Sequence, residues 1–463
     1  MRCWLVTAMA GLAAVASAGP LDTAWIKGET DKDPFSYRCG EEMTLKLTPM
    51  EGGGELKPGE YFLDWDRSGE DGVFEKGREP FDGKTPFVYR TKTAQPGFVR
   101  LRAYVVDAAG KRYQKVYTGD TSTPEGRAAA NRFERTNRGV FFDGGAGASV
   151  KEIKTYETPV DLAEYWHGLD ERLAKVPMEV VRKEVLTLSD GCKVYAVSIM
   201  CAGAFPVTGY LTMPKGGGRY PARLETHGYS GSVPIHRPNG NDHHLWRVNT
   251  CGEEIVLNIN PFGMLLPAFG GTDADQKAHW WAVHDGRKWS HGFSPDQNAD
   301  RDAAFFNGMV LRVKRALQYL KSLPEWDGQN LIASGGSQGG LQTIWAAACG
   351  EGVTRAESGI TWCCDMSKNT LRSEGKISTD NWYIPWTPAL AYYDPVQVAK
   401  LIPKTCKTII TRAGLGDYCC PPNGLFQLWT NIPNNKEIHW MQGSTHGYVP
   451  PQYPGRDYVW TAE

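Results

Sequence analysis

The sequence GGSQGG at residues 335–340 decides the fold of this 463-residue chain. It contains the pattern Gly-x-Ser-x-Gly centred on Ser337, which is typical of a nucleophile elbow, a sharp turn between a strand and a helix. Glycines are needed there because so tight a turn leaves almost no room for side chains beside the serine. Residues 330–334 predict a short buried strand, and apolar residues at helical spacing after the turn predict a helix: Leu341, Ile344, Trp345 and Ala348. The order strand, elbow, helix predicts an α/β fold.

Two further residues follow in the chain order serine, acid, histidine that this fold uses. Asp417 comes after the strand-like segment 408–411, and His446 comes after the segment 437–441, which we expect to be the last strand. The carboxyl ends of parallel strands meet at one edge of a sheet, where clefts form. Taken singly, Asp417 could be a helix cap and His446 an ordinary loop histidine. Together with Ser337 they predict a catalytic triad.

A second carboxylate competes with Asp417 for the role of the acid. Asp365 ends the apolar stretch 360–364, which predicts the strand after the nucleophile helix. Asp365 is therefore also expected to point into the cleft, and we rank it second. For the whole elbow the alternative is a glycine-rich turn without a chemical role.

Composition and charge narrow the class of protein. Hydrophobic residues make up 41% of the chain, enough to bury more than one core, and the length predicts two or three domains. The 51 basic and 52 acidic residues nearly cancel, which leaves no electrostatic footprint for nucleic acid or an anionic membrane. Neutral or polymeric substrates fit this balance better.

Residues 1–18 predict a secretory signal peptide. Arg2 precedes the short apolar run 4–16, and the sequence ASA at residues 16–18 matches a signal-peptidase site, so cleavage is expected near Ala18-Gly19. The run is too short to span a bilayer comfortably, which predicts a secreted or periplasmic protein without a membrane span. Disulfides are permitted in that compartment.

The sequence does not determine which cysteines form disulfides. Of the 11 cysteines, ten remain once Cys3 is discounted. Two vicinal pairs, at 363–364 and 419–420, lie beside predicted strands, where buried thiols are as reasonable as disulfides. We find no cysteine spacing that resembles a zinc site, and we assign no metal.

Residues 19–120 differ from the rest of the chain. Apolar and polar residues alternate in stretches such as 43–47 and 98–106, which predicts an immunoglobulin-like antiparallel β-sandwich. The acidic spacing from Asp64 to Glu75 matches an EF-hand loop, but its flanks predict strands where an EF-hand needs helices.

The remaining residues divide into a linker and a catalytic domain. The segments TSTP at residues 121–124 and GGAG at residues 144–147 predict a linker over residues 121–150. Strand-like and helical segments alternate over residues 151–463, which predicts an α/β-hydrolase domain with a mostly parallel sheet.

The catalytic part resembles the acetyl xylan esterase and cephalosporin C deacetylase family, carbohydrate esterase family seven of the α/β-hydrolases. The resemblance covers most of residues 151–463. It rests on four segments: 159–166, HGYSG at 227–231, GGSQGG at 335–340, and the run from GLGD to CPP at 414–422.

The resemblance implies the roles of five residues. Ser337, Asp417 and His446 would form the triad, and the backbone amides of Tyr229 and Gln338 would form the oxyanion hole. The Tyr229 donor also makes sense locally, because the residues before it are expected to end a strand beside the elbow.

Two positions depart from the family pattern. Where the family carries Arg-Gly-Gln after a strand, this chain has NPF at residues 260–262, and where the family has a glutamate after its histidine, this chain has Gly447. These changes predict the loss of a polar brace near the histidine loop. They bear on the pocket floor, the substrate and the family's ring-like oligomer, and leave the triad untouched.

The sequence therefore predicts a serine carboxylic-ester hydrolase that works through an acyl-enzyme and needs no cofactor. The resemblance implies acetylated xylan or its oligosaccharides as the substrate, and a homo-oligomer is left open. Alternatives are an esterase for larger acyl groups such as feruloyl or uronoyl, a serine peptidase, or a non-catalytic glycan-binding protein. Five tryptophans in two loop-like regions are candidate sugar platforms, although packing or a lid over the cleft is favoured: Trp280, Trp281, Trp289, Trp382 and Trp386.

Overall fold

The computed structural model describes residues 19–52, 54–136, 138–187, 191–229, 253–283, 294–368, 372–373, 376–377, 384–433, 435–451 and 457–462. The predicted signal peptide lies outside these residues. Among the helices described, none is long and apolar enough to cross a bilayer.

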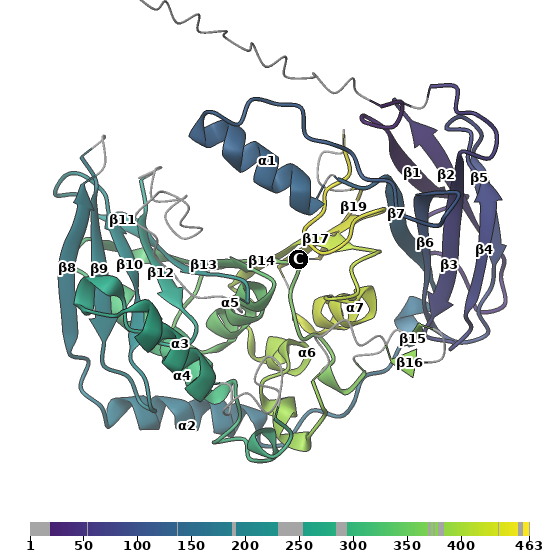
Figure 1. The fold of residues 1–463 in the computed structure, drawn as a ribbon. Coiled ribbons are helices and arrows are strands. Elements are labelled where there is room, and N and C mark those ends of the chain that lie inside the picture. Colours follow the sequence, from purple (N-terminus) through teal and green to yellow (C-terminus); the bar gives the residue numbers. More distant parts are fainter. Residues whose placement is uncertain are drawn as a thin grey trace, which may run out of the picture.

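Seven strands at the N-terminal side form two antiparallel sheets (Figure 1). One sheet has the order β1-β2-β5 and the other β4-β3-β6-β7. Alternate apolar residues of both sheets, including Leu45, Leu101 and Phe142, share one hydrophobic core. The strands are β1 (Trp25–Thr30), β2 (Met43–Met50), β3 (Tyr61–Gly69), β4 (Glu75–Pro80), β5 (Phe87–Thr91), β6 (Gly97–Asp107) and β7 (Phe141–Ala148).

The segment 121–150, expected to be a linker, is structured instead. It holds helix α1 (Pro124–Thr136) and strand β7, which pairs antiparallel with β6. The small residues that suggested a linker allow close packing, because a Cβ on Gly145 would lie 2.0 Å from the Val99 carbonyl oxygen. The β-sheet unit therefore extends beyond residue 120, and the division of the chain into domains stays a prediction.

A ten-stranded sheet forms the centre of the second part, with the order β19-β18-β17-β14-β13-β11-β12-β10-β9-β8. The six strands from β18 to β12 in this order run parallel to one another. The other strands pair antiparallel at the two edges. The strands are β8 (Val180–Thr187), β9 (Lys193–Ile199), β10 (Val207–Met213), β11 (Tyr220–Thr226), β12 (Ile255–Asn260), β13 (Trp326–Gly336), β14 (Arg355–Gly359), β17 (Lys407–Gly414), β18 (Lys436–Met441) and β19 (Tyr458–Ala462).

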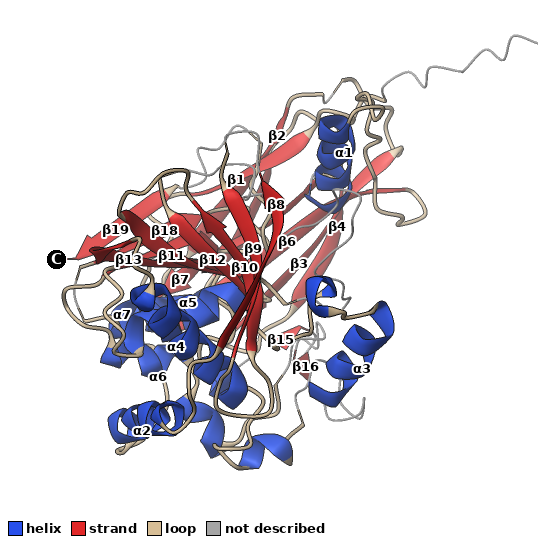
Figure 2. Ribbon diagram, turned by 90° about the vertical axis from the view of Figure 1, so that its left-hand side faces the viewer, coloured by secondary structure: helices blue, strands red, loops and turns tan. Residues whose placement is uncertain are grey.

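Helices α4 to α7 gather on one face of this sheet (Figure 2). The helices of this part are α2 (Leu162–Ala174), α3 (Asp273–Val283), α4 (Asn307–Ser322), α5 (Gln338–Ala348), α6 (Pro395–Val398) and α7 (Pro422–Asn431); a short hairpin, β15 (Arg372–Ser373) and β16 (Lys376–Ile377), completes the described elements. The mostly parallel sheet with helices confirms the predicted α/β class.

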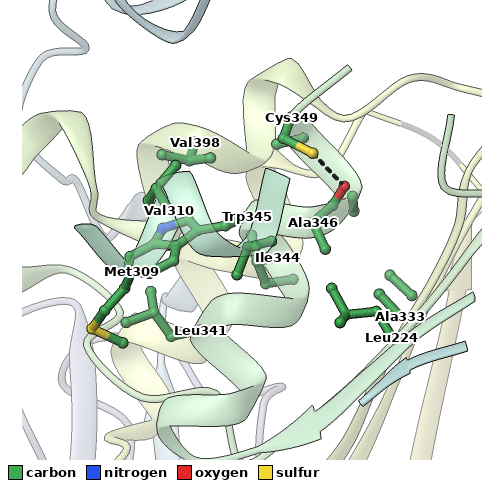
Figure 3. Packing of buried hydrophobic residues seen from close by; sticks show 14 of the residues in the cluster. Leu224, Met309, Val310, Ala333, Leu341, Ile344, Trp345, Ala346, Cys349 and Val398 are labelled. Carbon is green, nitrogen blue, oxygen red and sulfur yellow. Dashed lines mark hydrogen bonds between the residues drawn. The ribbon is translucent and has the colours of Figure 1, made fainter. Parts of the chain in front are cut away.

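Helix α5, which follows the elbow, is buried along its whole length. Figure 3 shows Leu341, Ile344 and Trp345 packed among side chains of α4, α6 and the sheet. The indole Nε1 of Trp345 donates to the Tyr393 carbonyl oxygen at 2.8 Å. The helical spacing seen in the sequence thus corresponds to a helix clamped in the core, which fixes the position of the elbow.

Two predictions about strands were wrong: the stretch 360–364 is not a strand, and the strand at 437–441 is not the last one. The stretch 360–364 is a turn that follows β14, with Ile360 and Cys363 at positive φ. It is apolar because it is buried, and burial alone does not distinguish a strand from a buried turn. Strand β18 is followed by β19, which adds to the sheet edge.

Three of the five tryptophans considered as sugar platforms lie in the described part of the chain, and they pack against other side chains. Trp280 and Trp281 lie in helix α3 and not in a loop, and the Trp280 side chain is buried against Phe262. Trp386 packs against Tyr156 with ring centroids 4.6 Å apart. Trp289 and Trp382 lie outside the described residues.

We predict that Gly145→Ala lowers the free energy of unfolding by about 1–3 kcal/mol, because the new methyl group overpacks the β6–β7 contact. Chemical denaturation measures the change. Gly168→Ala in α2 is the matched control, since its Cβ would meet no atom within 4 Å. A Gly145→Ala variant as stable as Gly168→Ala would contradict the packing described here.

Candidate active site

Ser337 lies between the end of β13 and the start of α5, with φ 58° and ψ −121°. Such a backbone costs an ordinary residue about 1–3 kcal/mol and persists only where its surroundings hold it. The Ser337 N–H donates to the Gly359 carbonyl oxygen at 2.9 Å, and its carbonyl oxygen accepts from the N–H groups of Leu341 and Trp362. Gly339 is needed because a Cβ there would lie 2.5 Å from the Thr226 carbonyl oxygen. This is the geometry of a nucleophile elbow.

Two backbone segments meet at the elbow where an oxyanion would form. Gln338 is the first residue of α5, and the first N–H groups of a helix have no acceptor within it. On the other side, a Cβ placed on Gly228 would lie 3.7 Å from the Ser337 Cβ. Tyr229 follows, its ring packed at 5.4 Å from that of Trp280. The arrangement fits the predicted donors Tyr229 and Gln338, whose role stays a prediction; residues 230 and 231 of the same motif lie outside the described part.

Asp417 is fully buried after strand β17 and faces His446. Its Oδ2 lies 3.0 Å from His446 Nδ1, and its Oδ1 accepts from the N–H groups of Cys419 and Cys420 at 3.0 and 2.9 Å. Because the carboxylate is the acceptor, Nδ1 carries the ring proton and Nε2 is left as an acceptor. That is the tautomer a general base requires.

The carboxylate also changes the acidity of the ring. Burial lowers the pKa of His446, but the negative charge of Asp417, its hydrogen bond and the neighbouring Cys419 outweigh this effect and raise the pKa above its ordinary value. A protonated imidazole is thus stabilised beside Asp417. This suits a base that must hold a proton briefly during acyl transfer.

Asp365, the second-ranked acid, lies in another cluster. Its Oδ1 accepts from the Ser367 hydroxyl at 2.8 Å, and its N–H donates to Asp394 Oδ1 at 3.2 Å. Burial and the nearby charge of Asp365 raise the pKa of Asp394 to about 7. The structure brings Asp417 to His446 and places Asp365 beside Asp394, at the start of α6.

Two thiols beside His446 were not anticipated as part of the site. Cys420 Sγ lies 3.7 Å from His446 Nδ1, and its S–H donates to the Ile360 carbonyl oxygen at 3.1 Å. Hydrogen bonds from Cys420 and His446 lower the pKa of Cys419 to about 7, against the opposing effect of burial. Both cysteines are free, as are Cys363 and Cys364, whereas Cys192 is disulfide-bonded.

The loop at residues 415–421 carries Asp417 and is called the acid loop below. It packs against the N-terminal sheet β4-β3-β6-β7. Arg100 of β6 and Asp143 of β7 form a buried bidentate ion pair, with N–O distances of 2.7 and 2.6 Å. The Arg100 guanidinium lies 3.9 Å from the ring centre of Tyr418, the residue after Asp417. Gly416 is pressed against the Asp143 carbonyl, so that a Cβ there would lie 1.9 Å from that oxygen.

The loop that carries His446, the histidine loop, also packs against strand β7. The Gln442 side chain accepts from the Gly145 N–H at 2.9 Å and donates to the Gly145 carbonyl oxygen at 2.8 Å. Beyond the histidine, Tyr448 packs against Phe141 with ring centroids 4.8 Å apart. Strand β7 therefore supports both loops, a role hidden in the sequence by its linker-like composition.

The two departures from the family pattern have local explanations. Asn260 Oδ1 accepts from the N–H groups of Phe262 and Met264, and buried Arg312 of α4 donates through Nε to the Pro261 carbonyl oxygen at 2.9 Å. This corner is thus braced by an arginine from another element. Gly447 adopts φ 75°, a conformation that a glutamate would adopt only under strain.

A family model described as acetyl xylan esterase (AXE1) matches residues 147–378, half of the chain. The chain belongs to the acetyl xylan esterase family. It is a carboxylic ester hydrolase, as predicted. Acetyl esterase Axe7A of Xylanibacter ruminicola is 28% identical over 314 residues, which cover 65% of this chain and 68% of that protein.

Two solved structures are similar to part of this chain. The acetyl xylan esterase from Paenibacillus sp. R4 superposes with a TM-score of 0.51 at 20% identity, covering 65% of this chain and 94% of that one. For acetyl xylan esterase 1 from Thermoanaerobacterium sp. JW/SL YS485 the TM-score is 0.49 at 20% identity, over 65% and 93% of the two chains. The first of these supports the α/β-hydrolase fold.

We predict that Asp417→Asn lowers kcat on a small acetate ester by about 10⁴-fold, because the amide favours the wrong imidazole tautomer. Asp365→Asn should retain most of the activity, since its carboxyl lies beside Asp394. Steady-state kinetics on the two purified variants distinguishes these residues. The opposite ranking would make Asp365 the acid.

The support from β6 and β7 can be tested at the Arg100–Asp143 pair. Arg100→Met leaves a buried carboxylate without its partner, which should cost about 3–5 kcal/mol of stability and lower kcat through the acid loop. Arg78→Met is the matched control, because the Arg78–Asp64 pair on the same sheet is exposed and a surface ion pair contributes little to stability. Urea unfolding measures the loss of stability, and ester hydrolysis measures the loss of kcat. Equal losses in the two variants would show that the Arg100–Asp143 pair does not support the acid loop.

Proposed function

We propose that the chain removes acetyl groups from acetylated xylan or its oligosaccharides, with Ser337 as nucleophile, His446 as base and Asp417 as the orienting acid. The observation that carries the proposal is the buried Asp417 carboxylate at 3.0 Å from His446 Nδ1, in a protein whose strained serine elbow follows the central strand β13. The family supports the substrate class.

The reaction would proceed by acyl transfer. His446 Nε2 takes the proton of Ser337 as its oxygen attacks the ester carbonyl, and the same proton then goes to the departing sugar hydroxyl. The amides of Tyr229 and Gln338 would stabilise the oxyanion, each by about 3 kcal/mol. Water, activated by His446, releases acetate and restores the serine.

The surroundings of the elbow favour a small acyl group. The Tyr229 ring lies at 5.4 to 6.4 Å from three neighbouring aromatic rings, those of Trp280, Trp362 and Phe262. These rings pack close beside the proposed oxyanion donor, which favours acetyl esters over feruloyl or uronoyl esters.

We also propose that the protein is exported, with residues 1–18 removed near Ala18-Gly19. The disulfide at Cys192 is consistent with an oxidising compartment. The homo-oligomer stays a prediction.

We predict that Ser337→Ala lowers kcat by about 10⁶-fold on both acetylated xylo-oligomers and a small activated acetate ester. Acetate release by the mature chain measures this effect, and circular dichroism verifies that the variant is folded. Ser322→Ala, remote from the elbow on α4, is the matched control. Activity on the small ester alone would keep the hydrolase and reject xylan as substrate, whereas hydrolysis that persists in Ser337→Ala would reject the nucleophile.

A further inference from the structure

The turn after Asp417 carries two thiols next to the proposed base. One ligand atom from each of Cys419, Cys420 and His446 lies within 4.8 Å of the other two. Both cysteines are free. Thiolate and imidazole are the ligands that Zn²⁺ prefers, so the chemistry of the cluster suits a thiophilic cation.

The separation of two of these ligands already fits zinc. With Zn–S of about 2.3 Å and Zn–N of about 2.0 Å, tetrahedral geometry places sulfur and nitrogen about 3.5 Å apart. Cys420 Sγ and His446 Nδ1 are 3.7 Å apart. The Cys419 and Cys420 N–H groups both bond to Asp417 Oδ1, which holds the turn in this arrangement.

The cluster is open to solvent on one side. The His446 side chain is 36% exposed and Cys419 is partly exposed, whereas Cys420 is buried beneath them. An ion can therefore enter without unfolding the loop. It would replace the hydrogen bonds from Cys420 to Ile360 and from His446 to Asp417, and also those that Cys420 and His446 make with Cys419.

We propose that Cys419, Cys420 and His446 form an inhibitory site for Zn²⁺ or a similar thiophilic divalent cation. The two thiols release their protons to solvent as sulfur binds the metal. The ring binds through Nδ1, loses the proton there and takes one up at Nε2, so the ring stays neutral. Nε2 then carries a proton and cannot accept that of Ser337; this last step rests on the proposed role of His446 as base.

Calorimetric titration of the mature, tag-free chain with Zn²⁺ measures binding, and initial rates on a small acetate ester measure inhibition. We expect one Zn²⁺ per chain, loss of activity on binding, recovery with a chelator, and neither effect with Mg²⁺, which prefers oxygen ligands. Cys419→Ser should weaken zinc binding at least about tenfold, since it removes a ligand. Cys419→Ala gives a second variant in case the first folds poorly.

Cys39→Ser is the matched control, because Cys39 is a free, partly exposed thiol on the N-terminal side of the chain. It should bind zinc as the parent does, and so should Ser337→Ala, which keeps all three ligands. Zinc binding by a chain without esterase activity would uphold the site and reject the proposed function. Parent-like binding by both Cys419 variants, or full activity with zinc bound, would overturn the proposal.

Discussion

The buried carboxylate of Asp417 is the constraint around which the site is built. One oxygen holds the turn through the N–H groups of Cys419 and Cys420, and the other faces His446 Nδ1. A buried charge is costly unless it is paired and fully bonded, so the loop can adopt this geometry only when these donors are in place. The same contacts select the imidazole tautomer and bring two thiols to its edge.

The second constraint comes from outside the parallel sheet. Strand β7 contacts the acid loop through Asp143 and the histidine loop through Gly145. These loops lie after different strands of the large sheet, β17 and β18, and a common support keeps their relative position. The N-terminal sheet that contains β7 therefore helps to fix the positions of Asp417 and His446.

Local patterns in the sequence were sufficient for the elbow, the helix after it and the loops that carry Asp417 and His446. Each is a short apolar strand followed by residues with a distinct chemical role, and the parallel sheet brings such ends together. The prediction of a strand at 360–364 was wrong because a buried turn is as apolar as a buried strand. Strand β7 misled because its glycines, needed for close packing against β6 and the acid loop, have the composition of a linker. Contacts such as Arg100 with Tyr418 join residues more than three hundred positions apart, and no local pattern predicts them.

Ser337 is the proposed nucleophile, and Asp417 is proposed to activate it through His446. Reaction of the mature chain with a serine-directed phosphonate, followed by peptide mapping, tests both parts at once. We expect a single adduct on Ser337, formed much more slowly in Asp417→Asn. An adduct on another residue, or a rate that does not depend on Asp417, would contradict this proposal.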